Sequence, residues 1–520
     1  MSTHTTRSFS RFVTRALPAA LFLSTVAFGA QAQEKVLRVG ATQMPPSKAN
    51  TLEGTGTPGS VLWVALFDTF TELDAKSVAQ PMVAESWAFA NGAWRFKVRP
   101  NVKFWNGNAV TAQAAADIIN YLLTEEGRRT NTSNHLRVAG ITGAKVIDAM
   151  TVQVDTASPS PLIPAYMAVL PAIDIKYLTD GGATNFSTNP MGTGAFKIEA
   201  WTPNGVRIRS TKAYWKGSPK VDVIDYTEIP DSTARVGALI TGQIDIDNAT
   251  QPDVIPQIKA ARGNVDIGQT ARVHGISFVA APIADGRGEK SRFRDQRIRM
   301  AANLAVNKQA MLDNLFSGVG TIGSQAGTSS SYGFNPNVKP YPYDPARAKQ
   351  LLAEAGFPNG FDFVIEARVD DPIQKVMFEV AVNDMAKVGM RAQLLPITFA
   401  TQLKNFSSGT WAGEAFGIGH FVAPTMDVTA TFRLASCLKT PEVSVYYCNR
   451  EEADMVLAAN REFDQQKRLA ILHKLMELNH NNAPLLTMLE LPSIMGYGPR
   501  VRNLKTLNEN INYFDIDVVN

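Results

Sequence analysis

The sequence predicts an α/β protein with at least two lobes, from its length and from one strand–helix–strand unit. The 520 residues exceed the roughly 100–200 residues expected of one domain. Residues 361–367 (FDFVIEA) and 390–397 (MRAQLLPI) have the pattern of strands, and residues 371–389 between them have the pattern of a helix. A strand, a helix and a strand in succession are typical of an α/β lobe.

The other elements follow from hydrophobic periodicity and turn signals. A short β run is expected at 36–40. Polar and apolar residues alternate at 94–99, which predicts a half-buried strand, and a hairpin is expected at 194–212 about a Pro-Asn-Gly turn. The periodicity predicts helices at 60–70, 112–123, 231–242, 294–316, 345–356, 372–389 and 451–480, and extended chain at 507–519. Asp344-Pro345 and Asp371-Pro372 each place a capping residue before a proline, which is a typical helix start.

The first 32 residues have the features of a secretory signal peptide. A basic stretch leads into a short apolar segment that ends at an Ala-Gln-Ala cleavage site, residues 30–32. We therefore expect cleavage near Ala32 and an exported protein that begins near Gln33 and acts in the periplasm. The residue directly after this site is Gln33 and not a cysteine, so a lipid anchor is not expected.

The charge of the chain argues against nucleic acid as a partner. The formal net charge is +4, and Arg7, Arg11 and Arg15 of the signal segment supply three of these charges. The rest of the chain is therefore nearly neutral and has no basic excess to hold a polyanion.

Cys437 and Cys448 are the two cysteines of the chain, with ten residues between them. An exported protein folds in an oxidising compartment, so we predict a disulfide. The alternative is two buried free thiols. Two cysteines alone are a poor metal site, because a structural zinc takes about four ligands, and we predict no metal site.

Residues 54–59 (GTGTPG) fit the G-x-G-x-x-G pattern of a dinucleotide-binding turn. Such a turn directly follows a strand and opens a helix, but here about a dozen residues separate 36–40 from Gly54, and Pro58 lies inside the motif. The alternative is a loop whose glycines allow close backbone approach. The sequence also lacks G-x-x-x-x-G-K-[ST], H-E-x-x-H and G-x-S-x-G, so we expect neither a cofactor nor enzymatic activity.

Four segments resemble one family. Residues 82–113 combine Glu-Ser-Trp, an amphipathic strand and V-K-F-x-x-G-x-x-x-T-A. The other three segments are 189–201 (NPMGTGAFKIEAW), 213–246 (starting AYWKG) and 343–361 (YDPARAKQLLAEAGFPNGF). Through them the chain resembles solute-binding protein family 5, the dipeptide-, oligopeptide- and nickel-binding receptors of ABC importers, over essentially its whole length after the signal.

The resemblance implies a two-lobed periplasmic-binding-protein (flytrap) fold with an extra inserted subdomain. The first lobe would comprise 33–70, 194–272 and 485–520, the inserted subdomain 71–193, and the second lobe 273–484. Crossings near 270–276 and 484–494 would connect the lobes. The resemblance also implies a receptor without enzymatic activity, usually monomeric, that delivers its solute to a membrane permease driven by an ATPase.

Candidate ligand-binding residues also come from the resemblance. Thr55 and Gly56 fall in a loop that would line the ligand cleft, with a plain solvent loop as the alternative. Arg368 falls where dipeptide binders clamp the ligand carboxylate with a planar guanidinium; its alternative is a surface arginine. His420 takes the place of the aspartate that holds the ligand's α-ammonium, or is a packed histidine without ligand contact. Asp427 would restore the acid if the alignment shifts.

The histidine in place of the aspartate predicts the class of ligand. An imidazole is a poor partner for an ammonium group, so we expect a solute with an anionic group for Arg368 and no free α-amine. Candidates are a modified peptide, an opine-like conjugate or another organic acid, with a neutral saccharide as an alternative. Trp411 either stacks on an apolar part of the ligand or belongs to the core. Nickel is a weaker variant, because no spaced ligand cluster supports it.

Two other functions compete with import. An exported receptor could hand its ligand to a sensor or act as a chaperone on the same fold. An exported hydrolase or oxidoreductase would need a nucleophile–base pair or a cofactor loop, and the sequence offers neither.

Overall fold

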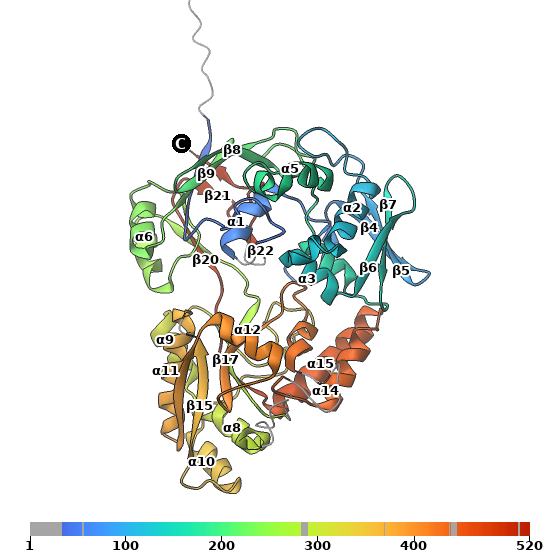
Figure 1. Cartoon of the computed structure of the whole chain (residues 1–520). Coiled ribbons are helices and arrows are strands. Elements are labelled where there is room, and N and C mark those ends of the chain that lie inside the picture. Colours follow the sequence, from blue (N-terminus) through green and yellow to red (C-terminus); the bar gives the residue numbers. More distant parts are fainter. Residues whose placement is uncertain are drawn as a thin grey trace, which may run out of the picture. The chain divides into compact units, whose positions relative to one another are not determined.

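The computed structural model describes residues 34–519 except 55–56, 282–289, 369, 436, 438–444 and 508–509. The predicted signal peptide lies outside the described residues, and so do Thr55 and Gly56. Residues 35–520 form one unit, whose three main sheets can be followed in Figure 1.

The first lobe is built on a seven-stranded sheet of order β12-β20-β11-β1-β10-β9-β8. Its strands are β1 (Val36–Ala41), β8 (Phe196–Thr202), β9 (Gly205–Ser210), β10 (Val223–Glu228), β11 (Ile246–Asp247), β12 (Asn264–Ile267) and β20 (Ile494–Tyr497). β8 and β9 form the predicted hairpin, and β1 runs parallel to both β10 and β11. The carboxyl ends of β1, β10 and β11 therefore lie at one edge of the sheet. Its helices include α1 (Thr57–Leu66), α6 (Ser232–Ile240) and α7 (Ile255–Ala260).

The inserted subdomain has a four-stranded antiparallel sheet. Its strands, in sheet order, are β4 (Ala84–Ala90), β5 (Ala93–Val98), β7 (Thr151–Thr156) and β6 (Ile141–Val146). The helices are α2 (Ala112–Leu123), α3 (Asn131–Val138), α4 (Ile163–Tyr166) and α5 (Ile175–Thr188), and a short pair, β2 (Thr71–Leu73) and β3 (Ala79–Pro81), joins the sheet to the first lobe. Thr111 caps α2, as its sequence predicts.

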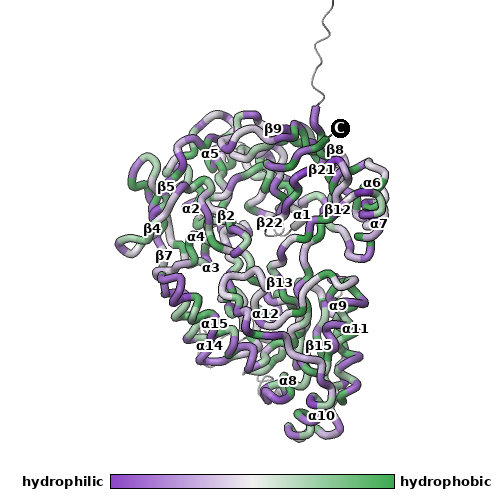
Figure 2. The backbone as a smooth tube through the Cα atoms, turned by 180° about the vertical axis from the view of Figure 1, so that it is seen from behind, coloured by the Kyte–Doolittle hydropathy of each residue, from purple (hydrophilic) through white to green (hydrophobic). Residues whose placement is uncertain are grey.

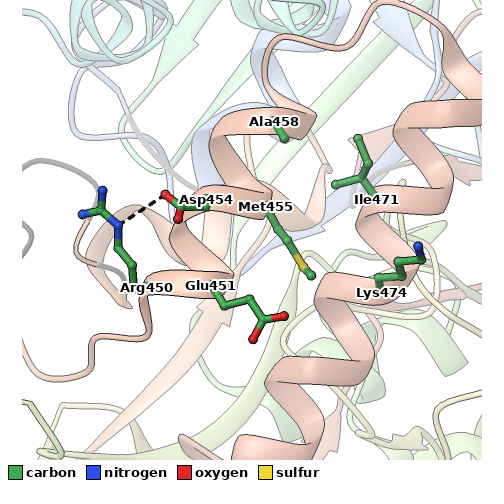
Figure 3. Close-up of a pocket in the computed structure, with 7 residues that line it drawn as sticks. All are labelled: Arg450, Glu451, Asp454, Met455, Ala458, Ile471 and Lys474. Carbon is green, nitrogen blue, oxygen red and sulfur yellow. Dashed lines mark ion pairs between the residues drawn. The ribbon is translucent and has the colours of Figure 1, made fainter.

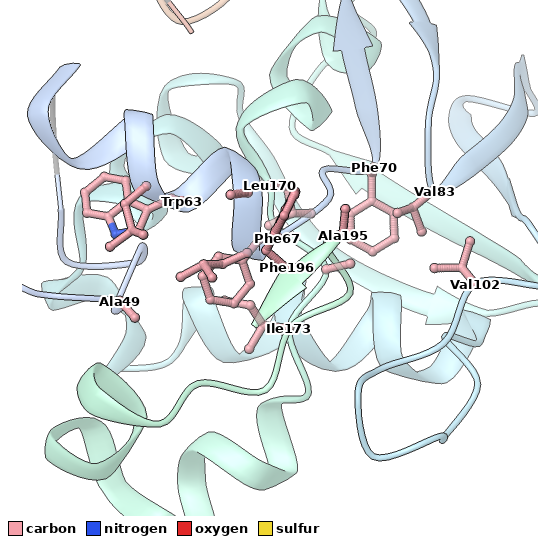
Figure 4. Packing of buried hydrophobic residues seen from close by; sticks show 14 of the residues in the cluster. Ala49, Trp63, Phe67, Phe70, Val83, Val102, Leu170, Ile173, Ala195 and Phe196 are labelled. Atoms are coloured by element: carbon pink, nitrogen blue, oxygen red, sulfur yellow. The ribbon is translucent and has the colours of Figure 1, made fainter. Parts of the chain in front are cut away.

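One apolar core joins the first lobe to the inserted subdomain. Phe67 and Phe70, just after α1, pack with Leu170 and Ile173 of the subdomain and with Phe196 of β8 (Figure 4). All five side chains are at most 5% exposed. The inserted subdomain and the first lobe thus share one core, whereas the second lobe has a core of its own.

The second lobe is an α/β sheet of order β16-β15-β17-β13-β18. Its strands are β13 (Arg272–Phe278), β15 (Phe361–Arg368), β16 (Met390–Ile397), β17 (Ala415–Phe421) and β18 (Leu485–Thr487). Its helices are α8 (Gln296–Ala305), α9 (Lys308–Phe316), α10 (Pro345–Glu354), α11 (Pro372–Ala386), α12 (Phe399–Ser408), α13 (Phe432–Ala435), α14 (Arg450–Ala459) and α15 (Gln465–Asn482). The predicted β15–α11–β16 unit is confirmed, with β15 and β16 parallel.

The predicted helix at 294–316 is two helices. Val306 is extended, and Asn307 accepts a hydrogen bond from the backbone of Ala310, so it caps a new helix, α9. The apolar periodicity runs through this break and conceals it. The 451–480 stretch is likewise interrupted, between α14 and α15.

The second crossing lies later in the chain than residue 485. Residues 485–487 form β18 and pair with β13 of the second lobe, and β19 (Leu489–Glu490) pairs with β14 (Thr321–Ile322). The first lobe resumes at β20, and its last strands are β21 (Val501–Arg502), β22 (Thr506–Leu507), β23 (Asn510–Ile511) and β24 (Asp517–Val518). The boundary prediction is corrected because three apolar residues after α15 complete the second sheet.

The disulfide prediction is confirmed, since Cys437 and Cys448 are bonded with their Cα atoms 5.1 Å apart. Hydrophobic stretches along the chain are short and broken by hydrophilic residues (Figure 2). Accordingly, across the described part of the chain no helix combines the length and hydrophobicity needed to cross a bilayer.

Candidate functional site

The carboxyl edge of the second sheet carries two of the predicted ligand-binding residues. β15, β16 and β17 run parallel, and β13 runs antiparallel to β17. The last residue of β15, Arg368, and the end of β17, at His420, therefore lie at the same edge as the first residue of β13, Arg272. Open α/β sheets bind ligands at this edge.

Arg368 and His420 also share a face of the sheet. Glu366 of β15 stands opposite Phe416 of β17. Side chains alternate along a strand, so Arg368 lies on the face of Glu366, and His420 lies on the face of Phe416. The structure thus brings together the two residues on which the ligand prediction depends.

The guanidinium of Arg368 is already held in place. Its Nε donates to Oδ1 of Asp370 at 2.8 Å, and its Cζ lies 4.7 Å from the ring centre of Phe399, at the start of α12. The Arg368 hydrogen bond lowers the pKa of Asp370. This bond uses one of the five N–H groups of the guanidinium, and the side chain is 19% exposed. Arg368 is therefore a preoriented cation at the edge, partly neutralised by Asp370.

A second arginine at this edge was not predicted from the sequence. Nη1 of Arg272 lies 3.5 Å from Oδ2 of Asp371, and its Cζ lies 4.2 Å from the ring centre of Phe421. Asp371 also caps α11 through Gln374. The prediction that Asp371 begins a helix is thus confirmed, and Asp370 and Asp371 have a further role in holding two arginines. The signal available was the position of Arg272 in the expected crossing at 270–276.

His420 is buried and electrically neutral at pH 7. It is 6% exposed, and neither ring nitrogen has a hydrogen-bond partner among the described residues. Burial lowers its pKa to about 4. A buried polar atom without a hydrogen-bond partner destabilises the folded state. A hydrogen bond from a ligand or a water molecule to this imidazole would therefore be favourable. It cannot supply a negative charge to an ammonium.

Trp411 and Asp427 lie elsewhere. Trp411 precedes the amino end of β17, is 1% exposed, stacks on Phe416 with ring centres 3.8 Å apart and donates to the carbonyl of Val445. The core alternative for Trp411 is therefore the one that the structure shows. Asp427 is 2% exposed, and its Oδ2 accepts from Nη1 of Arg468 at 2.6 Å. The carboxylate of Asp427 is therefore already neutralised by an arginine of the protein.

The carboxyl edge of the first sheet, where β1, β10 and β11 end, carries polar groups that were not predicted from the sequence. Oδ1 of Asn248, after β11, accepts from the backbone of Thr42, and Oε2 of Glu228 accepts from that of Met44. Beneath them, Arg235 and Asp247 form a fully buried ion pair of 2.7 Å. These contacts fix the loop that follows β1.

The GTGTPG segment can be followed at its two ends. A Cβ on Gly54 would lie 1.7 Å from the Trp63 ring, so Gly54 is required for close approach to α1. The motif ends inside α1, which begins at Thr57. The ligand contact predicted for Thr55 and Gly56 stays a prediction, because both lie outside the described residues.

Two cavities among the described residues involve the second lobe. One, of about 540 Å³, lies between α14 and α15, and its lining includes Glu451 and Met455 of α14 and Ile471 and Lys474 of α15 (Figure 3). The other, of about 180 Å³, is lined by residues of both the inserted subdomain and the second lobe. In the described ranges, three or more His, Cys, Asp or Glu side chains do not gather in a way that could hold a metal ion.

Comparison with known proteins gives one family. Residues 78–436 match bacterial extracellular solute-binding proteins, family 5 Middle. Heme-binding protein A of Haemophilus influenzae is 27% identical over 62% of this chain, although the match spans only 59% of that protein. The dipeptide-binding protein of Escherichia coli K12 is 24% identical over 90% of this chain and 91% of its own. The glutathione-binding protein GsiB of Salmonella typhimurium is 27% identical over 74% of each chain.

Solved structures share the fold. HbpA2 from Haemophilus parasuis superposes with a TM-score of 0.81 at 19% identity, over 93% of this chain and all of that one. The binding protein AgaA of A. tumefacien R10, solved with agropinic acid, gives a TM-score of 0.73 at 20% identity over 93% and 99% of the two chains. The architecture predicted from the sequence is thereby confirmed.

Proposed function

The chain belongs to the family 5 bacterial extracellular solute-binding proteins, and we propose that it is the periplasmic receptor of an ABC importer for a small organic acid that lacks a free α-amine. The solute would be captured between the two lobes and delivered to a membrane permease driven by an ATPase. The names of its relatives, which bind dipeptides, glutathione and heme, support a receptor for peptide-like or other small solutes. They do not favour the alternatives of a signalling receptor, a chaperone or an exported hydrolase.

We also propose that the receptor acts as a monomer and does not chemically change its solute. The carboxyl edge of the second sheet supports the second part, that the solute is bound without being chemically changed. Its described groups are two paired arginines, their two aspartates and a neutral imidazole, an arrangement suited to orienting a ligand by hydrogen bonds and charge.

The prediction of the ligand class rests on one observation: the imidazole of His420 is neutral, and neither of its nitrogens has a hydrogen-bond partner among the described residues. A buried ammonium without an anion would cost several kcal/mol, whereas a neutral imidazole can accept from a hydroxyl or amide and donate to a carbonyl. On the same face of the sheet, Arg368 offers hydrogen-bond donors to a carboxylate. A modified peptide, an opine-like conjugate or another N-blocked acid matches both groups.

A thermal-shift screen tests this proposal. Peptides, N-blocked peptides, opines, sugars and metal ions would be added to the chain without its first 32 residues. We expect hits among acids without a free α-amine, with a stabilisation of about 2.7 kcal/mol at a hundredfold excess over Kd. The shift should disappear in Arg368→Ala and persist in Arg347→Ala, which removes an exposed arginine of the same lobe. Sugars as the best ligands, or full binding by Arg368→Ala, would contradict the proposal.

A further inference from the structure

A cavity of about 180 Å³ lies where the inserted subdomain meets the second lobe. The subdomain contributes residues after β2, the indoles of β4 and β5, and the segment around α4, while the second lobe contributes the loop after β17 and the start of α15. Phe463 closes one side, with its ring centre 4.5 Å from that of Phe89 and 6.0 Å from that of Trp94. Because both lobes supply walls, the cavity exists only while they are in contact.

The walls of this cavity differ in chemistry. On the subdomain side they are mainly apolar, formed by Trp87, Trp94 and the rings of Pro161 and Pro164. On the side of the second lobe the rings of Tyr332 and Phe463 stand beside polar side chains, which are those of Thr425, Asp427, Gln465 and Arg468. An amphipathic wall of this kind suits a group with an apolar body and one polar atom.

Two of the three guanidinium nitrogens of Arg468 donate hydrogen bonds, and the third has no hydrogen-bond partner among the described residues. Nε donates to the carbonyl of Ala459 at 3.0 Å, and Nη1 donates to Oδ2 of Asp427 at 2.6 Å. Arg468 as a whole is only 5% exposed. Its Nη2 is buried and has no hydrogen-bond partner among the described residues. Oδ1 of Asp427 already accepts from both the backbone and the hydroxyl of Thr429. The guanidinium also lies over the ring of Tyr332, with its Cζ 5.2 Å from the ring centre. A partner for Nη2 would have to be an acceptor.

The ion pair of Arg468 and Asp427 indicates that an acceptor for Nη2 is uncharged. The carboxylate of Asp427 cancels the charge of Arg468, so an anion in the cavity would meet no net attraction and would lose its hydration. A neutral carbonyl or hydroxyl pays no such cost. At about 30 Å³ per water molecule, the volume admits a small ring or a branched chain but not a large solute.

We propose that this cavity is a second subsite of the solute-binding cleft, which takes an uncharged apolar group with a hydrogen-bond acceptor such as an amide carbonyl. The proposal rests on the receptor function proposed above for the source of that group. In it, Trp87, Trp94 and Phe463 enclose the apolar body, and Nη2 of Arg468 donates to the acceptor. The subsite selects among acids by the neutral end of the molecule.

Benzamide and benzoate are matched probes for this subsite, and their dissociation constants can be measured by ligand-observed NMR titration. We expect benzamide to bind the wild-type chain more tightly than benzoate. Ala165→Leu and Ala79→Leu each extend a cavity-lining side chain and should weaken benzamide about tenfold or more. Ala168→Leu is the control, since Ala168 packs against the same apolar cluster as Ala165 and Ala79 without lining the cavity. Thermal unfolding without probe verifies that each variant is folded.

Three outcomes would overturn the proposal: no benzamide binding to the wild type, unchanged binding in both filled variants, or tighter binding of benzoate. None of them depends on the solute. A failed solute screen with intact benzamide binding would therefore count against the receptor function alone, and solute capture that survives both filled variants would count against the subsite alone.

Discussion

We expect Arg235→Met to lower the free energy of unfolding of the first lobe by about 3–5 kcal/mol. Arg235 is 2% exposed, and its Nε donates to Asp247 at 2.7 Å. Its terminal nitrogens donate to the carbonyls of Ile229, Pro230 and Ala249. Methionine fills much of the space, but it leaves Asp247 as an unpaired charge in the core, and three carbonyls lose their donors.

The measurement is urea unfolding of the variant beside two controls. Arg347→Met breaks an ion pair whose side chains are 43% and 40% exposed, so we expect a loss below about 1 kcal/mol. Arg235→Met combined with Asp247→Leu removes both charges and should recover most of the stability. A single variant as stable as the wild type would show that Asp247 finds another partner, contrary to the geometry described.

The second large effect is expected at Lys308. This lysine at the start of α9 is 3% exposed and lies 3.5 Å from Oδ1 of Asn303 and 5.0 Å from the ring centre of Tyr341. Burial lowers its pKa to about 7, below the value of about 10.4 expected in the unfolded chain. Between these two values the unfolded chain holds one more proton, so stability must rise as the pH rises from 7 towards 10.

Lys308→Met removes this titration. We expect it to raise the free energy of unfolding at pH 6–7 by several kcal/mol, on the order of 1.4 kcal/mol per unit of pKa shift, and to flatten the increase between pH 7 and 10. Lys349→Met, on the exposed side of α10, should change neither. Chemical unfolding at pH 6, 8 and 10 measures the slope, and an unchanged slope in Lys308→Met would refute the role of this amine.

Local sequence signals predict the elements well where one cap or turn decides them. Asp371 before a proline begins α11, Thr111 begins α2, and the Pro-Asn-Gly turn makes the β8–β9 hairpin. They fail where tertiary contacts decide. The break between α8 and α9 lies within continuous apolar periodicity, and residues 485–487 join the second sheet only because β13 offers them an edge.

The site was harder to predict because its chemistry depends on pairing across strands. The sequence pointed to Arg368 and His420, but not to the neutral state of the imidazole, which follows from burial. It did not indicate that Asp370 and Asp371 each hold an arginine. Asp427 looked like an available acid, and only the fold shows it bound to Arg468, forty-one positions away.

The most direct test of the central claim is calorimetric titration with alanyl-phenylalanine and with its N-acetyl derivative. The two ligands share a carboxylate and differ in the α-ammonium that His420 cannot hold. We predict that the wild-type chain binds the N-acetyl form about tenfold or more tightly than the free dipeptide, and that His420→Asp reverses the order. Tight binding of the free dipeptide by the wild type would contradict the assignment of His420, because the ammonium would then have found its anion elsewhere.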